Sequence, residues 1–196
     1  MMTVEVFPLR FYEESPEIVA KNLLGKFLFK REDDAFLGGL IVETEAYYGF
    51  EDPASRAFGG IKNYNITMQE EPGRVFIYNV HKYWMLNIVA HGPNRIGAVL
   101  IRALQPTEGI EIMKRNRPVR EITDLTTGPG KLTLALGIDK HLNGVPVTSS
   151  ESQIFVANNN VKFEIGSSRR IGVKKDLNQN LRFFIKGNEF VSTKRE

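Results

Sequence analysis

Apolar runs of strand length follow one another in this sequence with turns rather than helices between most of them, and this spacing constrains the fold most. Residues 74–80 and 83–90 form two such runs, separated only by His81 and Lys82, which fit a tight hairpin tip. A third run, over residues 97–104, is bounded by Pro106. Strands are predicted over residues 27–30, 37–46, 74–80, 83–90 and 97–104, with shorter ones over 152–157, 161–165, 181–186 and 189–192.

Three segments carry helix signals. The Ser-Pro-Glu sequence at residues 15–17 supplies a hydroxyl cap, a first-turn proline and an acidic first turn, and Gly25 is expected to end that helix. Residues 108–117 have a helical pattern with a basic end. Residues 128–138 predict a helix that opens on glycines, and residues 119–127 predict a loop or a short helix.

The mixture of helices and antiparallel strands, without regular βαβ alternation, predicts the α+β class. The chain of 196 residues is long enough to bury a sizeable core. No repeat, heptad or low-complexity linker divides it. We therefore expect one domain over residues 1–196.

Composition excludes several classes of function. The chain has no cysteine, which excludes disulfides and thiolate metal sites, and its three histidines are too widely spaced to predict a histidine-rich metal site. No segment approaches the roughly 18 apolar residues that a membrane-spanning helix needs, so we expect a cytoplasmic protein. A net charge of +3 leaves a solvated surface and a polyanion-binding face equally open.

Two carboxylates end an apolar strand. Side chains alternate along a strand, so Glu43 and Glu45 are expected on one face and Thr44 on the other. Beside Tyr47 and Tyr48, such a carboxylate could act as a general base in a partly desolvated pocket. The alternative is a simple pairing with a surface lysine or arginine.

Two polar side chains interrupt neighbouring apolar strands. Asn87 and Arg102 require partners if they are buried, because an unsatisfied amide costs roughly 1–3 kcal/mol and a charge costs more. Glu43 or Glu45 is the expected partner of Arg102, in either a structural or a functional ion pair. Tyr78 lies near these positions and, like most aromatics, belongs either to the core or to a slot for a flat ligand.

Several stretches together resemble one family, the alkyladenine (methylpurine) DNA glycosylases. The matching stretches are VETEAYYGFEDPAS, Asn65 to Met68, EPGRVFIY, LNIV, GAVLIRALQPTEGIEIM, TGPGKLTLALGI and LRFFIKGNEFVS. They follow the family's order over essentially the whole chain. The resemblance implies an α+β domain with an antiparallel sheet, related to the C-terminal domain of methionyl-tRNA formyltransferase and acting without metal or cofactor. It also implies association with the nucleoid if the protein is prokaryotic, and a monomer is the default expectation.

The resemblance also implies a reaction on double-stranded DNA that contains a damaged purine, which is flipped into a pocket. Glu45 would activate a water that attacks the sugar, with Arg102 holding the carboxylate and the water. Tyr47 and Tyr78 would sandwich the base, and Asn87 would clash with the 2-amino group of normal guanine. No strand-cleaving lyase step is implied.

The chain departs from the family pattern where DNA and base would be contacted. Arg56 replaces a histidine that hydrogen-bonds the base, and Lys62-Asn63-Tyr64-Asn65 replaces a Thr-x-Arg-Asn segment near a phosphate. The hairpin tip is shortened to His81-Lys82, so the residue inserted into DNA would be His81, or Tyr83 if the register shifts. Further DNA contacts are expected from Lys82, Asn65 and Lys131, the last at a glycine-fronted helix start whose amides suit a phosphate or merely form a turn.

Arg56 gives rise to a hypothesis about the substrate. Guanidinium donors suit the O6 and N7 acceptors of neutral deaminated purines, and a fixed positive charge disfavours alkylated cations. The alternatives are that Arg56 pairs with Glu51 or Asp52, or that it binds a phosphate. Two other functions remain open at this stage: a non-catalytic nucleic-acid-binding module with the same fold, and a metal-dependent nuclease that uses Glu43, Glu45 and Asp52.

Overall fold

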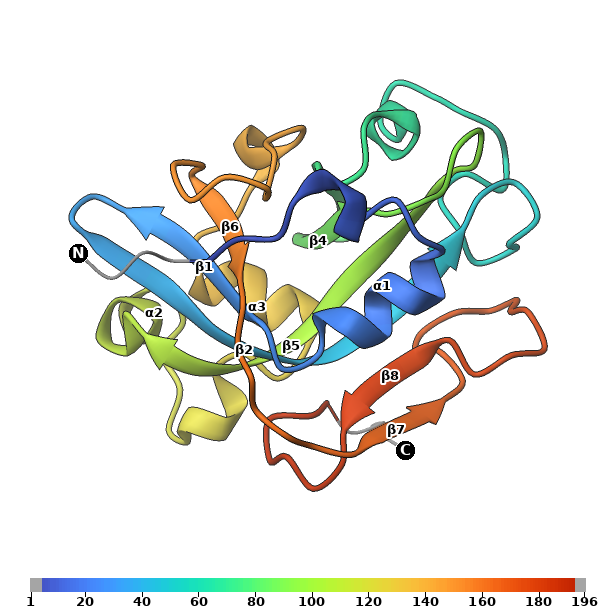
Figure 1. Cartoon of the computed structure of the whole chain (residues 1–196). Coiled ribbons are helices and arrows are strands. Elements are labelled where there is room, and N and C mark those ends of the chain that lie inside the picture. The colour runs from blue at the N-terminus through green and yellow to red at the C-terminus, as the bar shows by residue number, and fades with distance from the viewer. Residues whose placement is uncertain (1–4, 193–196) are drawn as a thin grey trace.

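The sheet is organised around one long strand, β2 (Ala35–Tyr48), in the computed structural model, which describes residues 5–192. Its other strands are β1 (Phe27–Glu32), β3 (Val75–Val80), β4 (Tyr83–Val89), β5 (Gly97–Glu108), β6 (Ile154–Ala157), β7 (Ile165–Ser168) and β8 (Arg182–Ile185). The order across the sheet is β3-β4-β5-β2-β1-β6, and β8 pairs with β2 while β7 pairs with β8. All of these pairs are antiparallel. Figure 1 shows β2 and β5 running side by side through the middle of the molecule.

Two glycines allow β2 to approach both of its neighbours closely. A Cβ atom at Gly38 would lie 1.9 Å from the backbone oxygen of Leu28 in β1. A Cβ atom at Gly39 would lie 2.0 Å from the backbone oxygen of Gln105 in β5. Both separations are shorter than any allowed contact, so a side chain at either position would force the strands apart.

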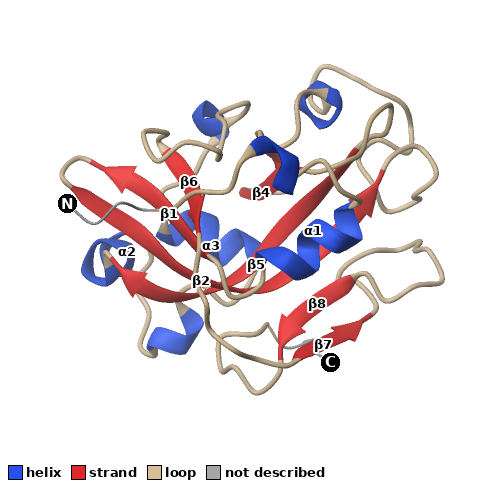
Figure 2. Ribbon diagram, viewed as in Figure 1, coloured by secondary structure: helices blue, strands red, loops and turns tan. Residues whose placement is uncertain are grey.

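Helices cover both faces of the sheet, as Figures 1 and 2 show. The three α-helices are α1 (Pro16–Leu23), α2 (Ile110–Asn116) and α3 (Pro129–Ala135). The Ser15 hydroxyl caps α1 by accepting the Ile18 amide at 3.4 Å, and the Thr44 hydroxyl of β2 donates to the Ala20 carbonyl at 2.9 Å. On the other side, the Thr133 hydroxyl of α3 donates to the Trp84 carbonyl of β4 at 2.9 Å. Both helices are thus fixed to the sheet by buried polar contacts as well as by apolar packing.

The predicted α+β class, the antiparallel sheet and the capped first helix are confirmed. Pro106 was expected to bound a strand, but β5 continues through it to Glu108. Pro106 lies opposite Gly39 beside a register shift, and an irregular position tolerates the missing amide hydrogen. No helix of the described residues is long and apolar enough to cross a membrane.

Two of the short C-terminal strands were predicted wrongly. The strand expected over residues 161–165 forms later, as β7, with only Ile165 in common. Residues 189–192 form a turn, in which Asn188 accepts the amides of Phe190 and Val191. Their apolar side chains pack against the core from this turn, so apolar residues here indicate burial without strand pairing.

Candidate active site

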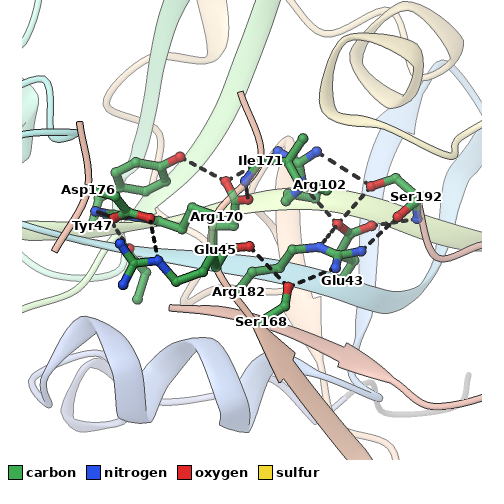
Figure 3. A network of polar contacts seen from close by, with 12 residues as sticks. Glu43, Glu45, Tyr47, Arg102, Ser168, Arg170, Ile171, Asp176, Arg182 and Ser192 are labelled. Carbon is green, nitrogen blue, oxygen red and sulfur yellow. Dashed lines mark hydrogen bonds and ion pairs between the residues drawn. The ribbon is translucent and has the colours of Figure 1, made fainter. Parts of the chain in front are cut away.

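Polar side chains of β2 and β5 meet on the sheet face opposite α1. Thr44 points to α1, so Glu43 and Glu45 lie on the other face, as predicted. Arg102 binds both carboxylates: Nε donates to Glu43 Oε1 at 2.8 Å and Nη1 donates to Glu45 Oε2 at 3.2 Å. Figure 3 shows this arginine between the two glutamates. The expectation that Arg102 takes Glu43 or Glu45 as its partner is confirmed for both.

A β-bulge explains how one arginine reaches two glutamates. In the register of β2 and β5, Glu43 lies opposite Ala103 and Thr44 lies opposite Ile101, so Arg102 has no direct partner in β2. A bulge leaves one residue outside the regular ladder and re-aims its side chain. The guanidinium of Arg102 is therefore placed between the two carboxylates rather than opposite one of them.

Glu43 is a structural carboxylate, because protein donors occupy both of its oxygens. Besides Arg102, it accepts from Arg182 Nε at 2.7 Å, and from the Ser192 hydroxyl and amide, each at 2.7 Å. An ionised carboxylate offers about four acceptor positions. Oε1 accepts three of these donors and Oε2 accepts the fourth, and Glu43 is fully buried among Arg102, Arg182 and Ser192.

Glu45 is also fully buried, but it keeps one acceptor position free. Oε1 accepts the Ile171 amide at 2.7 Å, and Oε2 accepts the Tyr47 hydroxyl at 2.8 Å in addition to Arg102. Burial raises the pKa of Glu45, and Arg102, the Ile171 amide and the Tyr47 hydroxyl oppose that rise. The result is a desolvated carboxylate of raised proton affinity, which suits a general base.

A cleft of about 730 Å³ opens in front of Glu45. Tyr47, Arg102 and Ile171, which are the three residues that bind Glu45, all line it, and Tyr78 faces it as well. Burial raises the pKa of Tyr78, and burial together with the nearby Glu45 charge raises that of Tyr47, so both phenols stay neutral. Tyr47 and Tyr78 therefore line a cleft at the carboxylate while their rings also pack against buried apolar residues.

A narrow space of about 10 Å³ continues from the tyrosines to Asn87, which is buried. The side-chain amide of Asn87 donates to the carbonyls of Phe76 and Met85, at 3.1 and 3.2 Å. The polar residue that interrupts this apolar strand therefore has hydrogen-bond partners for its buried NH₂ group. The Arg56 guanidinium lies 4.5 Å from the centroid of the Tyr78 ring at the same place. The space holds no more than about one water, so a purine enters only if these walls separate.

Arg56 forms no ion pair within residues 5–192, and the predicted alternative in which it pairs with Glu51 or Asp52 is wrong. Asp52 is bound instead by Arg170, with Nη1–Oδ2 and Nη2–Oδ1 distances of 2.6 and 2.7 Å. A bidentate arginine leaves this carboxylate no room for a second cation. Arg56 is therefore left to the aromatic wall of the cleft.

Sequence reasoning missed the loop between β7 and β8, which completes the site. Ile171 supplies an amide to Glu45, Arg170 lies 4.5 Å from the Tyr47 ring centroid, and Val173 lines the cleft. In the sequence its basic residues, Arg169, Arg170, Lys174 and Lys175, indicate no more than a positively charged surface. The signal that was present is the pair of acids, Asp52 and Asp176, that an arginine buried here would need.

The residues predicted to contact DNA differ in their exposure and in their partners within the protein. His81 and Lys82 are exposed at the tip of the β3–β4 hairpin, whereas the Tyr83 ring packs against Gly130 at the start of α3. Lys131, also in α3, pairs with Asp124.

The structure does not bring Asn65 to the surface where a DNA contact was expected. Asn65 is fully buried, and its amide donates to the carbonyls of Arg56 and Gly60, at 2.7 and 3.1 Å. Its side-chain oxygen accepts the Lys62 amide at 2.6 Å. Asn65 thus holds together the loop that carries Arg56.

A metal site is not indicated by the side chains that the structure describes. No three histidine or carboxylate side chains between residues 5 and 192 lie close enough to hold an ion. Of the three acids considered for a nuclease, Glu43 is bound by four donors and Asp52 is paired with Arg170.

Comparisons with known proteins show which family this sequence resembles along most of its length. A family model described as methylpurine-DNA glycosylase matches residues 10–189. Relatives carrying the name "Putative 3-methyladenine DNA glycosylase" include one from Aeropyrum pernix, 40% identical over 97% of this chain and 94% of its own. One from Latilactobacillus sakei is 39% identical over 98% and 93%, and one from Clostridium perfringens strain 13 is 40% identical over 94% and 97%. In these three matches the similarity covers at least 93% of each chain.

Proposed function

Because the chain belongs to the methylpurine-DNA glycosylase family, we propose that it hydrolyses the N-glycosidic bond of a flipped-out damaged purine in double-stranded DNA and leaves an abasic site. The observation that carries this proposal is the buried Glu45 carboxylate, held by three residues that line a tyrosine-walled cleft. The chain acts as a monomeric enzyme of base excision repair.

The chemistry uses the one acceptor position that Glu45 keeps free. A water there donates to the carboxylate, and its oxygen attacks the anomeric carbon of the sugar while Glu45 takes a proton. The bond from that carbon to the purine nitrogen breaks, and its electron pair leaves with the base. Arg102 holds Glu45 in position and remains charged, because the two glutamates raise its pKa against the effect of burial.

The cleft walls account for recognition of a flat base. Tyr47 and Tyr78 stack on its two faces, and the target reaches them only after flipping out of the duplex. Asn87 at the end of the narrow space is held by two backbone carbonyls, so it cannot swing aside for the 2-amino group of guanine. Normal guanine is therefore rejected by a clash.

Arg56 directs the preference toward neutral deaminated purines such as hypoxanthine. Its guanidinium stands over Tyr78, where a base would stack, and no carboxylate neutralises it within the described residues. It therefore offers donors to O6 and N7 acceptors and repels a cationic alkylated purine.

The hairpin tip inserts His81 into the gap that the flipped nucleotide leaves. Tyr83 is the other candidate, but its ring is packed on Gly130, and a Cβ atom there would lie only 2.9 Å from it. Freeing Tyr83 requires that contact to break, whereas His81 and Lys82 are already exposed.

A duplex with one hypoxanthine, and a matched duplex treated with a methylating agent, test the function. We expect strand breaks only after hot alkali, with or without EDTA, and none with the Glu45→Gln variant. Breaks that need no alkali and disappear with EDTA would identify the nuclease instead. DNA binding without base release would identify the binding module instead. The pairing of Lys131 with Asp124 does not favour that alternative, because it engages a lysine that would otherwise contact a phosphate.

A further inference from the structure

Arg170 is a buried arginine whose donors are all used within the protein. Nε donates to Asp176 Oδ1 at 2.9 Å, Nη1 to the Ala46 carbonyl at 2.9 Å and to Asp52, and Nη2 to Asp52 and Asp176. A guanidinium has five N–H donors, so none is left for a ligand. Whatever Arg170 contributes to the site, it contributes through other residues.

The contacts of Arg170 join segments that are far apart in the sequence. Ala46 lies in β2, Asp52 lies in the turn that follows it, and Asp176 lies in the loop before β8. Asp52 also accepts the amides of Tyr48 and Ala54, each at 3.0 Å, so the turn is fixed to the same ion pair. The β7–β8 loop is thereby tied to the strand that carries Glu45.

One consequence concerns the wall of the cleft. The Arg170 guanidinium covers one face of Tyr47, with its central carbon 4.5 Å from the ring centroid. Only the opposite face of the ring remains for a base. Since the guanidinium is held bidentately by Asp52, the plane of Tyr47 is fixed before any substrate arrives.

A second consequence concerns the carboxylate. Ile171 directly follows Arg170, and its amide donates to Glu45 Oε1 at 2.7 Å, as Figure 3 shows. This bond opposes the rise that burial causes in the pKa of Glu45. A loop released from Arg170 would no longer hold that amide in place.

We infer that Arg170 is a positioning residue of the proposed glycosylase reaction, which orients Tyr47 for stacking and holds the Ile171 amide on Glu45. The inference rests on the proposed function for its effect on rate. Its effect on Glu45 is a property of the protein alone, so the two are separable by experiment.

The experiment compares the wild-type chain with Arg170→Lys, Arg170→Gln and Asp52→Asn. The side-chain carboxyl carbon of Glu45 is followed by NMR during a pH titration, after assignment by its loss in Glu45→Gln. We expect Glu45 to titrate at higher pH in all three variants. The rate of single-turnover base release at neutral pH should fall about 10–100-fold. The acid limb of its pH profile should move to higher pH, and part of the rate should be recovered as the pH is raised.

Arg169→Gln is the control, because Arg169 is the exposed neighbour of Arg170 and contacts neither Tyr47 nor Asp52. It lies 3.6 Å from Asp176 Oδ2, whereas Arg170 binds Oδ1, so the variant leaves the bonds of Arg170 in place. It should leave the titration of Glu45 unchanged.

The inference is wrong if the Arg170 and Asp52 variants lose thermal stability while Glu45 titrates as in wild type. Arg170 would then stabilise the contact between the loops without positioning the site. Should Arg170→Gln not fold, Arg170→Lys, which keeps the charge, and Asp52→Asn give the same readout. A wild-type chain that releases no base refutes the function and leaves the titration result standing.

Discussion

Glu43 and Glu45 share one face of β2 and one arginine, yet four donors bind the Glu43 carboxylate whereas three bind the Glu45 carboxylate. Proximity in sequence therefore does not make them equivalent. Glu43 ties β2 to β8 and to the C-terminal turn through Arg182 and Ser192. Glu45 faces the three residues that line the cleft.

The first prediction separates these roles by amide substitution. Glu43→Gln places an NH₂ donor beside other donors and removes the negative charge that pairs with the buried Arg102 and Arg182. We therefore expect it to lower the free energy of unfolding by about 3–5 kcal/mol. Glu45→Gln should abolish base release while lesion binding persists. Urea unfolding and single-turnover assays measure the two effects. Turnover by Glu45→Gln would transfer the base role to Glu43.

The second prediction concerns the pH dependence of the rate. Glu45 must be ionised to accept a proton from water, and burial raises its pKa. The rate of base release should therefore fall as the pH drops through a value above the ordinary range of a glutamate. A pH profile under single-turnover conditions checks this, and a limb at or below the ordinary glutamate value would contradict it.

The third prediction applies the same pKa shift to stability. A carboxylate whose folded pKa is raised stabilises the fold below its unfolded pKa, and that contribution is lost as the pH rises through the folded pKa. Glu45→Gln, which does not ionise, should therefore gain stability relative to wild type as the pH increases from acid to neutral. Thermal unfolding over that range measures the difference, and Glu43→Gln, in which Glu45 is retained, should lack this rise.

The parts of the fold that could be predicted from the sequence are those fixed by local signals. The capped helix at Ser15, the hairpin over His81 and the shared face of Glu43 and Glu45 follow from turn chemistry and alternation. The bond between Asp52 and Arg170 spans 118 residues, and no local pattern indicates which buried acid an arginine will find. The burial of Asn65 could not be predicted for a related reason: a polar residue in a loop favours an exposed position, but this side chain bonds to the backbone carbonyls of its own loop.

The fourth prediction concerns lesion preference and Arg56. Replacing Arg56 by histidine removes a fixed cation from the Tyr78 face. Release of 7-methylguanine should rise relative to hypoxanthine by about tenfold, a difference of roughly 1.4 kcal/mol. Initial rates on the two duplexes give the ratio. A wild-type chain that already releases the cationic base faster would refute the preference proposed for Arg56.

The last prediction concerns Lys131 as a phosphate contact. Its pairing with Asp124 lowers the pKa of that acid and holds the ammonium group away from a competing anion. Asp124→Asn should release Lys131, tighten duplex binding and steepen the salt dependence of the affinity by about one unit of slope. Asp139→Asn is the matched control, since Asp139 is a similarly exposed acid that pairs with His141 instead. Equal gains in the two variants would reflect net charge alone. Asp124 also pairs with Arg117, so a larger gain at Asp124 assigns Lys131 to the DNA only if adding Lys131→Gln removes it.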